Sequence, residues 1–326
     1  MPIPGPGVPI SITTIVTEFG GTVPHSLSEY YRGGGLVPNS PTNAAIPTSG
    51  QIAMGNFYGA VNRVSIPIVL SSPQTSYDVF TNRGPTYVAG ASDITVTINP
   101  GVNITAPSTP VYAMLVPNAF NPADTVTIIN NGSITGCGGA GAAGGPSPAS
   151  VGGTGSGGGN ALFVNRPTTI QNPGTVAGGG GGGGGGGAIN GIAPRPKKAG
   201  GPVTRSSGGG GGGGGAGGAG GAGGAGGTGV NAGGSPGSAG TVSAPGAGGP
   251  GGSAPFAPVF PTFVATGGAG GAGGALGANG TGGGTGSATP GTPGAAGGSA
   301  GGAGNYIVGN PFVTWPVTGT RLGGVA

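Results

Sequence analysis

The side chains that could carry out acid–base, nucleophilic or metal chemistry are few and unevenly distributed. The chain has one histidine, His25, and five acidic residues, all within the first 124 positions: Glu18, Glu29, Asp78, Asp93 and Asp124. A serine nucleophile needs a nearby base, and a metal site needs several ligands at close spacing. We therefore expect no enzymatic activity, no metal and no other cofactor. His25 precedes a helix-capping segment, where a capping or packing role is expected.

Two stretches in the second half carry residues suited to binding. The first is basic and contains Arg195, Lys197, Lys198 and Arg205. Its charge could attract phosphates or acidic sugars of a cell surface, or simply keep a solvated loop soluble. The second contains Phe256, Phe260 and Phe263 among prolines. These rings could form an apolar or sugar-stacking tip, or fold back onto their support.

Nucleic acid and membrane are poor partners for this composition. The six cations that follow residue 124 are sparse, and no aromatic residue interleaves the basic stretch. Matches to G-x-G-x-x-G arise from the 89 glycines, and none follows a strand and opens a helix. No run of about 18 apolar residues is present to span a membrane, and the start lacks the features of a signal peptide. The single cysteine, Cys137, cannot form an internal disulfide, which suits assembly in a reducing cytoplasm.

The elements that must position these residues change along the chain. Residues 1–63 contain one short helix, predicted from the capping box at Ser26 to Glu29 and the glycines at 33–35. Residues 64–136 alternate threonine with β-branched apolar residues, as in 93–98 and 124–129, which predicts a small antiparallel β domain. Residues 305–326 return to a β-like pattern and are expected to close the glycine-rich region that precedes them.

Residues 137–304 are dominated by glycine tracts with a three-residue period. Glycine is uninterrupted over 178–187 and 208–215, and alanine then recurs at Ala216, Ala219, Ala222 and Ala225. Period three matches the extended polyproline II geometry and neither an α-helix nor a strand. Such a helix has no internal hydrogen bonds, so its backbone must pair with neighbours. We predict a bundle of packed polyglycine II helices, with 178–187 and 208–215 inside it and 216–227 and 267–275 nearer its surface.

The fold class is therefore mainly β and irregular, with very little α-helix. A small N-terminal β-rich domain precedes the glycine bundle, and the basic and phenylalanine-containing stretches form long loops between its rods.

Several non-glycine segments resemble bacteriophage tail proteins. SLSEYYRGGG at 26–35, with IPTSG at 46–50 and FYG at 57–59, resembles a segment near the N-termini of phage tail proteins. ALFVNRP at 161–167 running into the glycine tract, and the ending from Tyr306, resemble glycine-rich tail fibre adhesins. The resemblance implies polyglycine II helices at a fibre tip, whose variable loops touch a receptor on the host surface.

On this resemblance, the chain is expected to be a structural virion protein of a phage tail fibre or tail tip that binds a receptor during host attachment. Implied partners are other tail proteins, a protein or glycan receptor on the bacterium, and further copies of the chain, a trimer being one arrangement. Residues 1–63 would be the attachment segment to the virion. Its candidate contacts are Tyr30, Tyr31, Arg32, Phe57 and Tyr58.

Other classes remain open from the sequence. A purely structural tail component without receptor contact is the main alternative. A glycine-rich surface protein of mycobacterial type would share the Gly-Gly-Ala repeats, but its helical N-terminal domain is missing. An ice-binding bundle would also use three-residue helices, although small members would be expected to need disulfides. Disorder is the usual interpretation of such composition. Collagen is opposed by the broken register and the scarcity of proline in the repeats.

Overall fold

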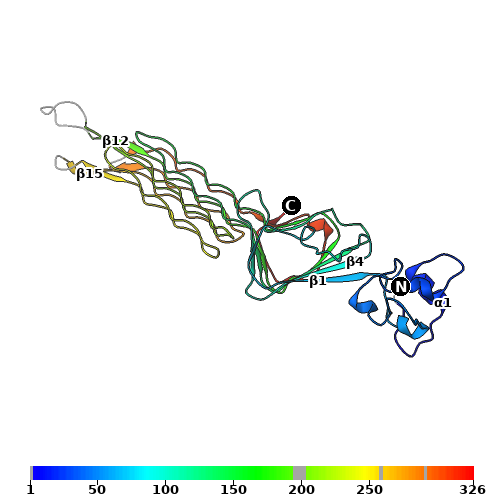
Figure 1. The fold of residues 1–326 in the computed structure, drawn as a ribbon. Coiled ribbons are helices and arrows are strands. Elements are labelled where there is room, and N and C mark those ends of the chain that lie inside the picture. The colour runs from blue at the N-terminus through cyan, green and yellow to red at the C-terminus, as the bar shows by residue number, and fades with distance from the viewer. Residues whose placement is uncertain (1–2, 194–202, 257–259, 290–291) are drawn as a thin grey trace.

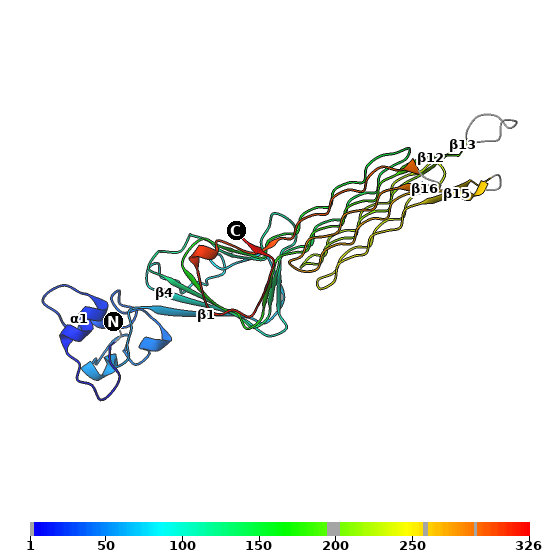
Figure 2. The same cartoon turned by 180° about the vertical axis from the view of Figure 1, so that it is seen from behind.

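The computed structural model describes residues 3–193, 203–256, 260–289 and 292–326. The molecule is elongated, with a small N-terminal unit, a middle part built of strands and a long glycine-rich bundle following one another along its length (Figure 1). The view from behind shows the same order (Figure 2). The described residues contain one α-helix among many short strands, which confirms the expectation of a mainly β and irregular fold.

The N-terminal unit is a small assembly of short helices. It contains α1 (Ile12–Phe19) and the 3₁₀ helices η1 (Leu27–Tyr30), η2 (Pro41–Asn43) and η3 (Met54–Phe57). The predicted capping box is present at η1, where the Ser26 N–H donates to the Glu29 carboxylate at 3.1 Å. The helix α1 was not expected, because its β-branched residues favour strands and only tertiary packing and its own cap make it helical.

The middle part is a parallel β-solenoid in which each turn of the chain adds a strand to each of three sheets. The first sheet has the order β1 (Val64–Leu70), β4 (Ser92–Ile98), β7 (Thr125–Asn130), β10 (Thr168–Gln171) and β19 (Val313–Val317). The second has β2 (Gln74–Thr75), β5 (Asn103–Thr105), β8 (Ser133–Thr135), β11 (Thr175–Ala177) and β20 (Thr320–Leu322). The third has β3 (Tyr77–Asp78), β6 (Met114–Val116), β9 (Leu162–Val164), β18 (Asn305–Val308) and β21 (Gly324–Val325).

The antiparallel pairing expected for residues 64–136 is wrong. Neighbouring strands in all three sheets run parallel, as in β1 with β4 and β4 with β7. Alternation of polar and apolar residues indicates a strand with one buried face, but it is the same for either pairing direction. The turn signals Asn99–Gly101 and Asn130–Gly132 lead from one sheet of the solenoid to the next, where we had expected hairpins.

The solenoid encloses one apolar core. Ile94, Val96 and Ile98 all point inward and are 1% exposed or less, as their alternation predicts. Parallel register repeats this arrangement from turn to turn, so that Val96 lies beside Ile128. Stacking of identical faces allows strands of only three residues, such as β5, to form part of a continuous sheet.

The glycine-rich bundle consists of two excursions from the solenoid. One leaves after β8 and returns at β9, and the other leaves after β11 and returns at β18, so both depart between the second and third sheets. Extended segments run back and forth along the bundle (Figure 1). They are residues 136–145, 151–160, 178–187, 208–217, 219–228, 233–240, 246–252, 267–275, 280–286 and 294–304.

Hydrogen bonds between these segments repeat every third residue. Within 178–187, successive N–H groups donate in turn to three neighbouring segments, and the fourth residue returns to the first neighbour. The acceptor segments are 153–159, 210–216 and 278–284. The carbonyls of Gly179 to Gly187 accept from three further segments, 139–145, 268–274 and 298–304. The central segment therefore has six neighbours, joined to it by N···O distances of 2.7–3.0 Å.

Burial follows the arrangement expected from the sequence, except that Ala216, expected near the surface, is buried because it belongs to the interior segment 208–217. All residues of 178–187 and 208–215 are buried. In 219–228 the pattern has period three, with Gly221, Gly224 and Gly227 buried while Ala222 and Ala225 are exposed. The all-glycine segments thus lie inside the bundle, and the alanine-bearing segments lie at its surface.

The C-terminal segment 305–326 belongs to the solenoid. Its strand β18 pairs with β9, and its last three strands form the final turn against β10, β11 and β18. The segment is β, as expected, but it extends the sheets of the middle part where we had expected it to close the glycine bundle.

Candidate receptor-binding tip

Short antiparallel strands occupy the end of the glycine bundle that is furthest from the solenoid (Figures 1 and 2). β12 (Ile189–Ala193) pairs with β13 (Val203–Ser207). β14 (Ser253–Phe256) pairs with β15 (Phe260–Thr266). β15 also pairs with β16 (Ser287–Thr289), and β16 pairs with β17 (Thr292–Pro293). The glycine tracts end where these strands begin, because a Cβ on an interior glycine would overlap the backbone of a neighbouring segment.

A small apolar cluster fixes the two groups of strands to each other. Ile189 of β12, Ala254 of β14 and Ala265 of β15 are each 2% exposed or less and pack together. β12 lies beside β15, and β13 lies beside β14. The turn after 219–228 adds a polar tie, since the Ser206 N–H donates to the Asn231 side-chain oxygen at 3.0 Å. The tip is therefore one packed unit.

The structure brings the two predicted binding stretches to the same end of the molecule. Arg205 lies in β13 and is half-buried. Phe256 is the last residue of β14 and pairs in register with Phe260 of β15, while Phe263 lies further along the same strand. Arg195, Lys197 and Lys198 lie outside the described residues. The sequence indicated two long loops between glycine rods, but it did not indicate that they would be neighbours.

In the sequence, every charged residue between β12 and β13 is basic. No acidic residue follows Asp124, so the stretch from β12 to β13 has four cations and no compensating carboxylate from the whole second half of the chain. Exposed apolar side chains accompany this charge, with Ile192 of β12 56% exposed and Val230 of the adjacent turn 84% exposed. The described part of the tip thus carries one cation, Arg205, together with accessible apolar side chains.

The residues expected to attach residues 1–63 to the virion do not form one exposed surface. Tyr30 and Phe57 are fully buried and pack with Phe19, with ring centroids 6.2–6.5 Å apart, so they are core residues of the N-terminal unit. They were attachment candidates because they lie in the segment that resembles phage tail proteins, whereas a unit this small needs its aromatic residues for its core. Tyr31, Arg32 and Tyr58 are half-buried.

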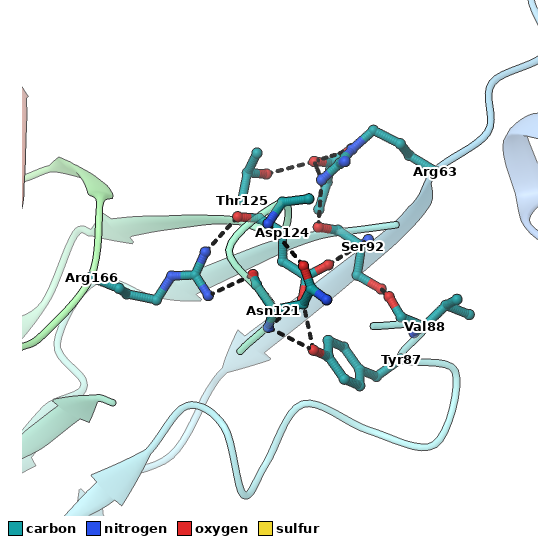
Figure 3. A network of polar contacts seen from close by, with 10 residues as sticks. Arg63, Tyr87, Val88, Ser92, Asn121, Asp124, Thr125 and Arg166 are labelled. Carbon is teal, nitrogen blue, oxygen red and sulfur yellow. Dashed lines mark hydrogen bonds and ion pairs between the residues drawn. The ribbon is translucent and has the colours of Figure 1, made fainter. Parts of the chain in front are cut away.

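A network of polar side chains stiffens the solenoid where its first turns begin (Figure 3). Arg63 donates to both oxygens of Asp93 at 2.9 Å and to the carbonyl of Ser92 at 2.8 Å. The Thr125 hydroxyl donates to the same carboxylate. Burial alone would raise the pKa of Asp93, but these hydrogen bonds outweigh it and lower the pKa. The network links the entry to β1 with β4 and β7.

Asp124 is the buried centre of the same region (Figure 3). Its carboxylate accepts from the Tyr87 hydroxyl at 2.6 Å and from the backbone N–H groups of Ser92 and Asn121 at 3.0 and 3.1 Å. Arg166 donates to the carbonyls of Asn121 and Asp124, and burial lowers its pKa. Sequence reasoning missed this cluster. The signal available in the sequence was that Asp124 and Arg166 are isolated charged residues next to apolar strand patterns.

The described residues contain no group of three or more histidine, cysteine, aspartate or glutamate side chains placed to hold a metal ion. None of the helices in the described ranges is both long enough and apolar enough to cross a membrane.

Comparison with known proteins gives one family and one solved structure. No curated protein matches the chain. The chain is similar to a chain of the solved structure titled "Crystal structure of the gp37-gp38 adhesin tip complex of the bacteriophage S16 long tail fiber", with 19% identity and a TM-score of 0.42, covering 99% of this chain and 100% of that one. Residues 65–326, from β1 to the last residue, match the family described as "Phage tail fibre adhesin Gp38". With the solenoid and the glycine bundle both inside that match, the chain belongs to the Gp38 family of phage tail fibre adhesins.

Proposed function

We propose that this receptor-binding tail adhesin contacts its bacterial receptor through the strands and loops of β12 to β17. The observation that carries the proposal is that two non-glycine stretches, far apart in the sequence, meet at the end of the bundle opposite the solenoid. Their side chains are basic or apolar, and the rods beneath them are almost free of functional groups. The tip is therefore the part of the bundle with the chemistry to recognise a surface.

The glycine segments serve this function as polyglycine II helices. In that geometry three residues make one turn, so the N–H and C=O groups of successive residues point in three directions. The six-neighbour hydrogen bonding of 178–187 is the pattern that such packing requires. At about 3.1 Å per residue, a ten-residue rod spans roughly 31 Å and holds the tip at that distance from the solenoid.

Residues 1–63 serve as the link to other tail proteins. They precede the range that matches the adhesin family and form a unit with its own apolar core. Tyr31, Arg32 and Tyr58, which are only half-buried, remain candidates for that contact. The chain is accordingly divided into an attachment unit, a solenoid base, a rigid spacer and a recognition tip.

Replacing the segments between β12 and β13 and between β14 and β15 tests receptor contact against the alternative of a purely structural tail component. Residues 194–202 and 257–259 are exchanged for glycine and serine at equal length, and binding of the fluorescently labelled full chain to susceptible cells is measured. Binding is expected to be lost while the thermal unfolding midpoint is unchanged.

The matched control makes the same exchange in the turn at 242–245, which reverses the chain at the solenoid end of the bundle. This variant is expected to bind cells normally. Undiminished binding by the tip variant, or equal loss in both variants, would support the structural alternative.

A further inference from the structure

A groove with a volume of about 350 Å³ lies on the outer face of the first solenoid sheet, away from the tip. It runs across the outward side chains of β7, β10 and β19 and is bordered by the loops before β7 and β10. This volume falls within the range of about 300–1,000 Å³ that is typical of small-ligand sites. Nothing in the receptor contact proposed above uses this face.

The floor of the groove is a row of threonine hydroxyls. Thr127, Thr169 and Thr314 are in register on adjacent parallel strands, and all three point outward. Their hydroxyls make no hydrogen bond within the described residues. Adjacent strands are about 4.8 Å apart, so the row presents three free donor–acceptor groups over roughly 10 Å.

One wall of the groove is an exposed aromatic ring. Phe312 ends the 3₁₀ helix η4 (Asn310–Phe312) and is 43% exposed. The helix is held by the Trp315 indole N–H, which donates to the Asn310 side-chain oxygen at 3.1 Å, and by the Phe312 N–H, which donates to the Gly309 carbonyl at 3.1 Å. The ring is therefore a fixed apolar platform beside the hydroxyls.

No exposed charged side chain of the described residues lines the groove, and the Arg63–Asp93 ion pair that Thr125 contacts lies next to it but outside its lining. Asp124 contributes to its lining, but the carboxylate is bonded to Tyr87 and Ser92 and the residue is only 4% exposed. The nearby Arg166 is 3% exposed. The backbone of β7 and β10 is paired on both sides, so in the middle of the floor only side chains can contact a ligand; β19, which carries Thr314, is the edge strand of the sheet.

We propose that this groove is a binding site for a neutral saccharide. A sugar ring has hydroxyls on its edge and apolar C–H groups on its faces, which matches a row of free hydroxyls beside an aromatic ring. The absence of charge selects neutral hexoses and N-acetylhexosamines over acidic sugars. The site would give the adhesin a second cell-surface contact, independent of the tip.

Binding of neutral oligosaccharides to the purified full chain tests the proposal. A panel of di- and trisaccharides built from hexoses and N-acetylhexosamines is screened by saturation-transfer NMR, and affinities of the hits are measured by calorimetry. Phe312→Ala is expected to weaken binding about tenfold. Thr169→Val, which keeps the shape but removes a hydroxyl, is also expected to weaken binding.

Thr97→Val is the matched control, because Thr97 is half-buried on the outward face of β4 but outside the groove. It should bind like the unchanged chain, and all variants should unfold at the same temperature. Binding by none of the panel, or equal affinity in the Phe312 and Thr97 variants, would overturn the proposal. Because this assay uses soluble saccharides, a negative result leaves the cell binding of the tip untouched, and a failure of the tip experiment leaves this one standing.

Discussion

The interior glycines make the strongest prediction, which concerns Gly182→Ala. A Cβ added at Gly182 would overlap the carbonyl oxygen of Ala140 on the neighbouring rod, far inside van der Waals contact. Separating the two rods by on the order of 1 Å breaks the hydrogen bonds between residues 139–145 and 180–186. Three such bonds contribute about 3 kcal/mol in total, and overpacking adds about 1–3 kcal/mol. The expected loss is about 4–6 kcal/mol, against roughly 5–15 kcal/mol for a typical domain.

Gly157→Ala is the matched control for this substitution. Gly157 is exposed, and its added Cβ would meet only the carbonyl oxygen of Gly302, at 3.7 Å. Its effect should lie between zero and a gain of about 1 kcal/mol, because alanine restricts the unfolded chain. Urea unfolding followed by circular dichroism gives both values. If the two variants differ by less than about 1 kcal/mol, the interior is not packed as described.

Two further predictions concern the polar network at the start of the solenoid. Tyr87→Phe removes a hydrogen-bond donor from the buried Asp124 carboxylate and should lower the free energy of unfolding by about 1–3 kcal/mol in a urea titration. Tyr112→Phe is the control, because the Tyr112 hydroxyl makes no hydrogen bond among the described residues, and it should change the free energy of unfolding little. Because the pKa of Asp93 is lowered in the folded state, its stabilising effect is complete above its unfolded pKa of about 3.9 and is lost as the pH falls through the folded value. Arg63→Gln should flatten the decline in stability below about pH 4, and an unchanged slope would contradict this role.

Local features of the fold were predictable from the sequence because they depend on periodicity. The three-residue spacing of alanines indicated which edge of a rod faces outward, as it does at Ala222 and Ala225, and Ile94 to Ile98 indicated a strand with one buried face. The direction of strand pairing was not predictable, since it depends on how the chain returns between strands. Here β10 and β19 are neighbours although the long glycine excursion separates them in sequence.

The candidate binding surfaces differ in how well they could be predicted from the sequence. The basic and aromatic stretches at the tip stood out because large side chains interrupt glycine tracts. The threonine row formed by Thr127, Thr169 and Thr314 did not, because turns of unequal length place its members at irregular intervals. Such a row becomes visible only when the parallel register is known.

The hydrogen bonds that join neighbouring rods also have a mechanical consequence. If the tip holds the receptor and residues 1–63 hold the virion, as proposed, a bound virion that drifts in flow pulls on the tip approximately along the rods, since the tip and the N-terminal unit lie at opposite ends of the molecule. Sliding residues 178–187 out of the bundle would require the bonds to all six neighbours to yield together, in shear, because they cross the direction of pull. Because glycine has no side chain, the rods approach one another closely enough for every rod to hydrogen-bond to its neighbours. These bonds should give the adhesin its tensile strength.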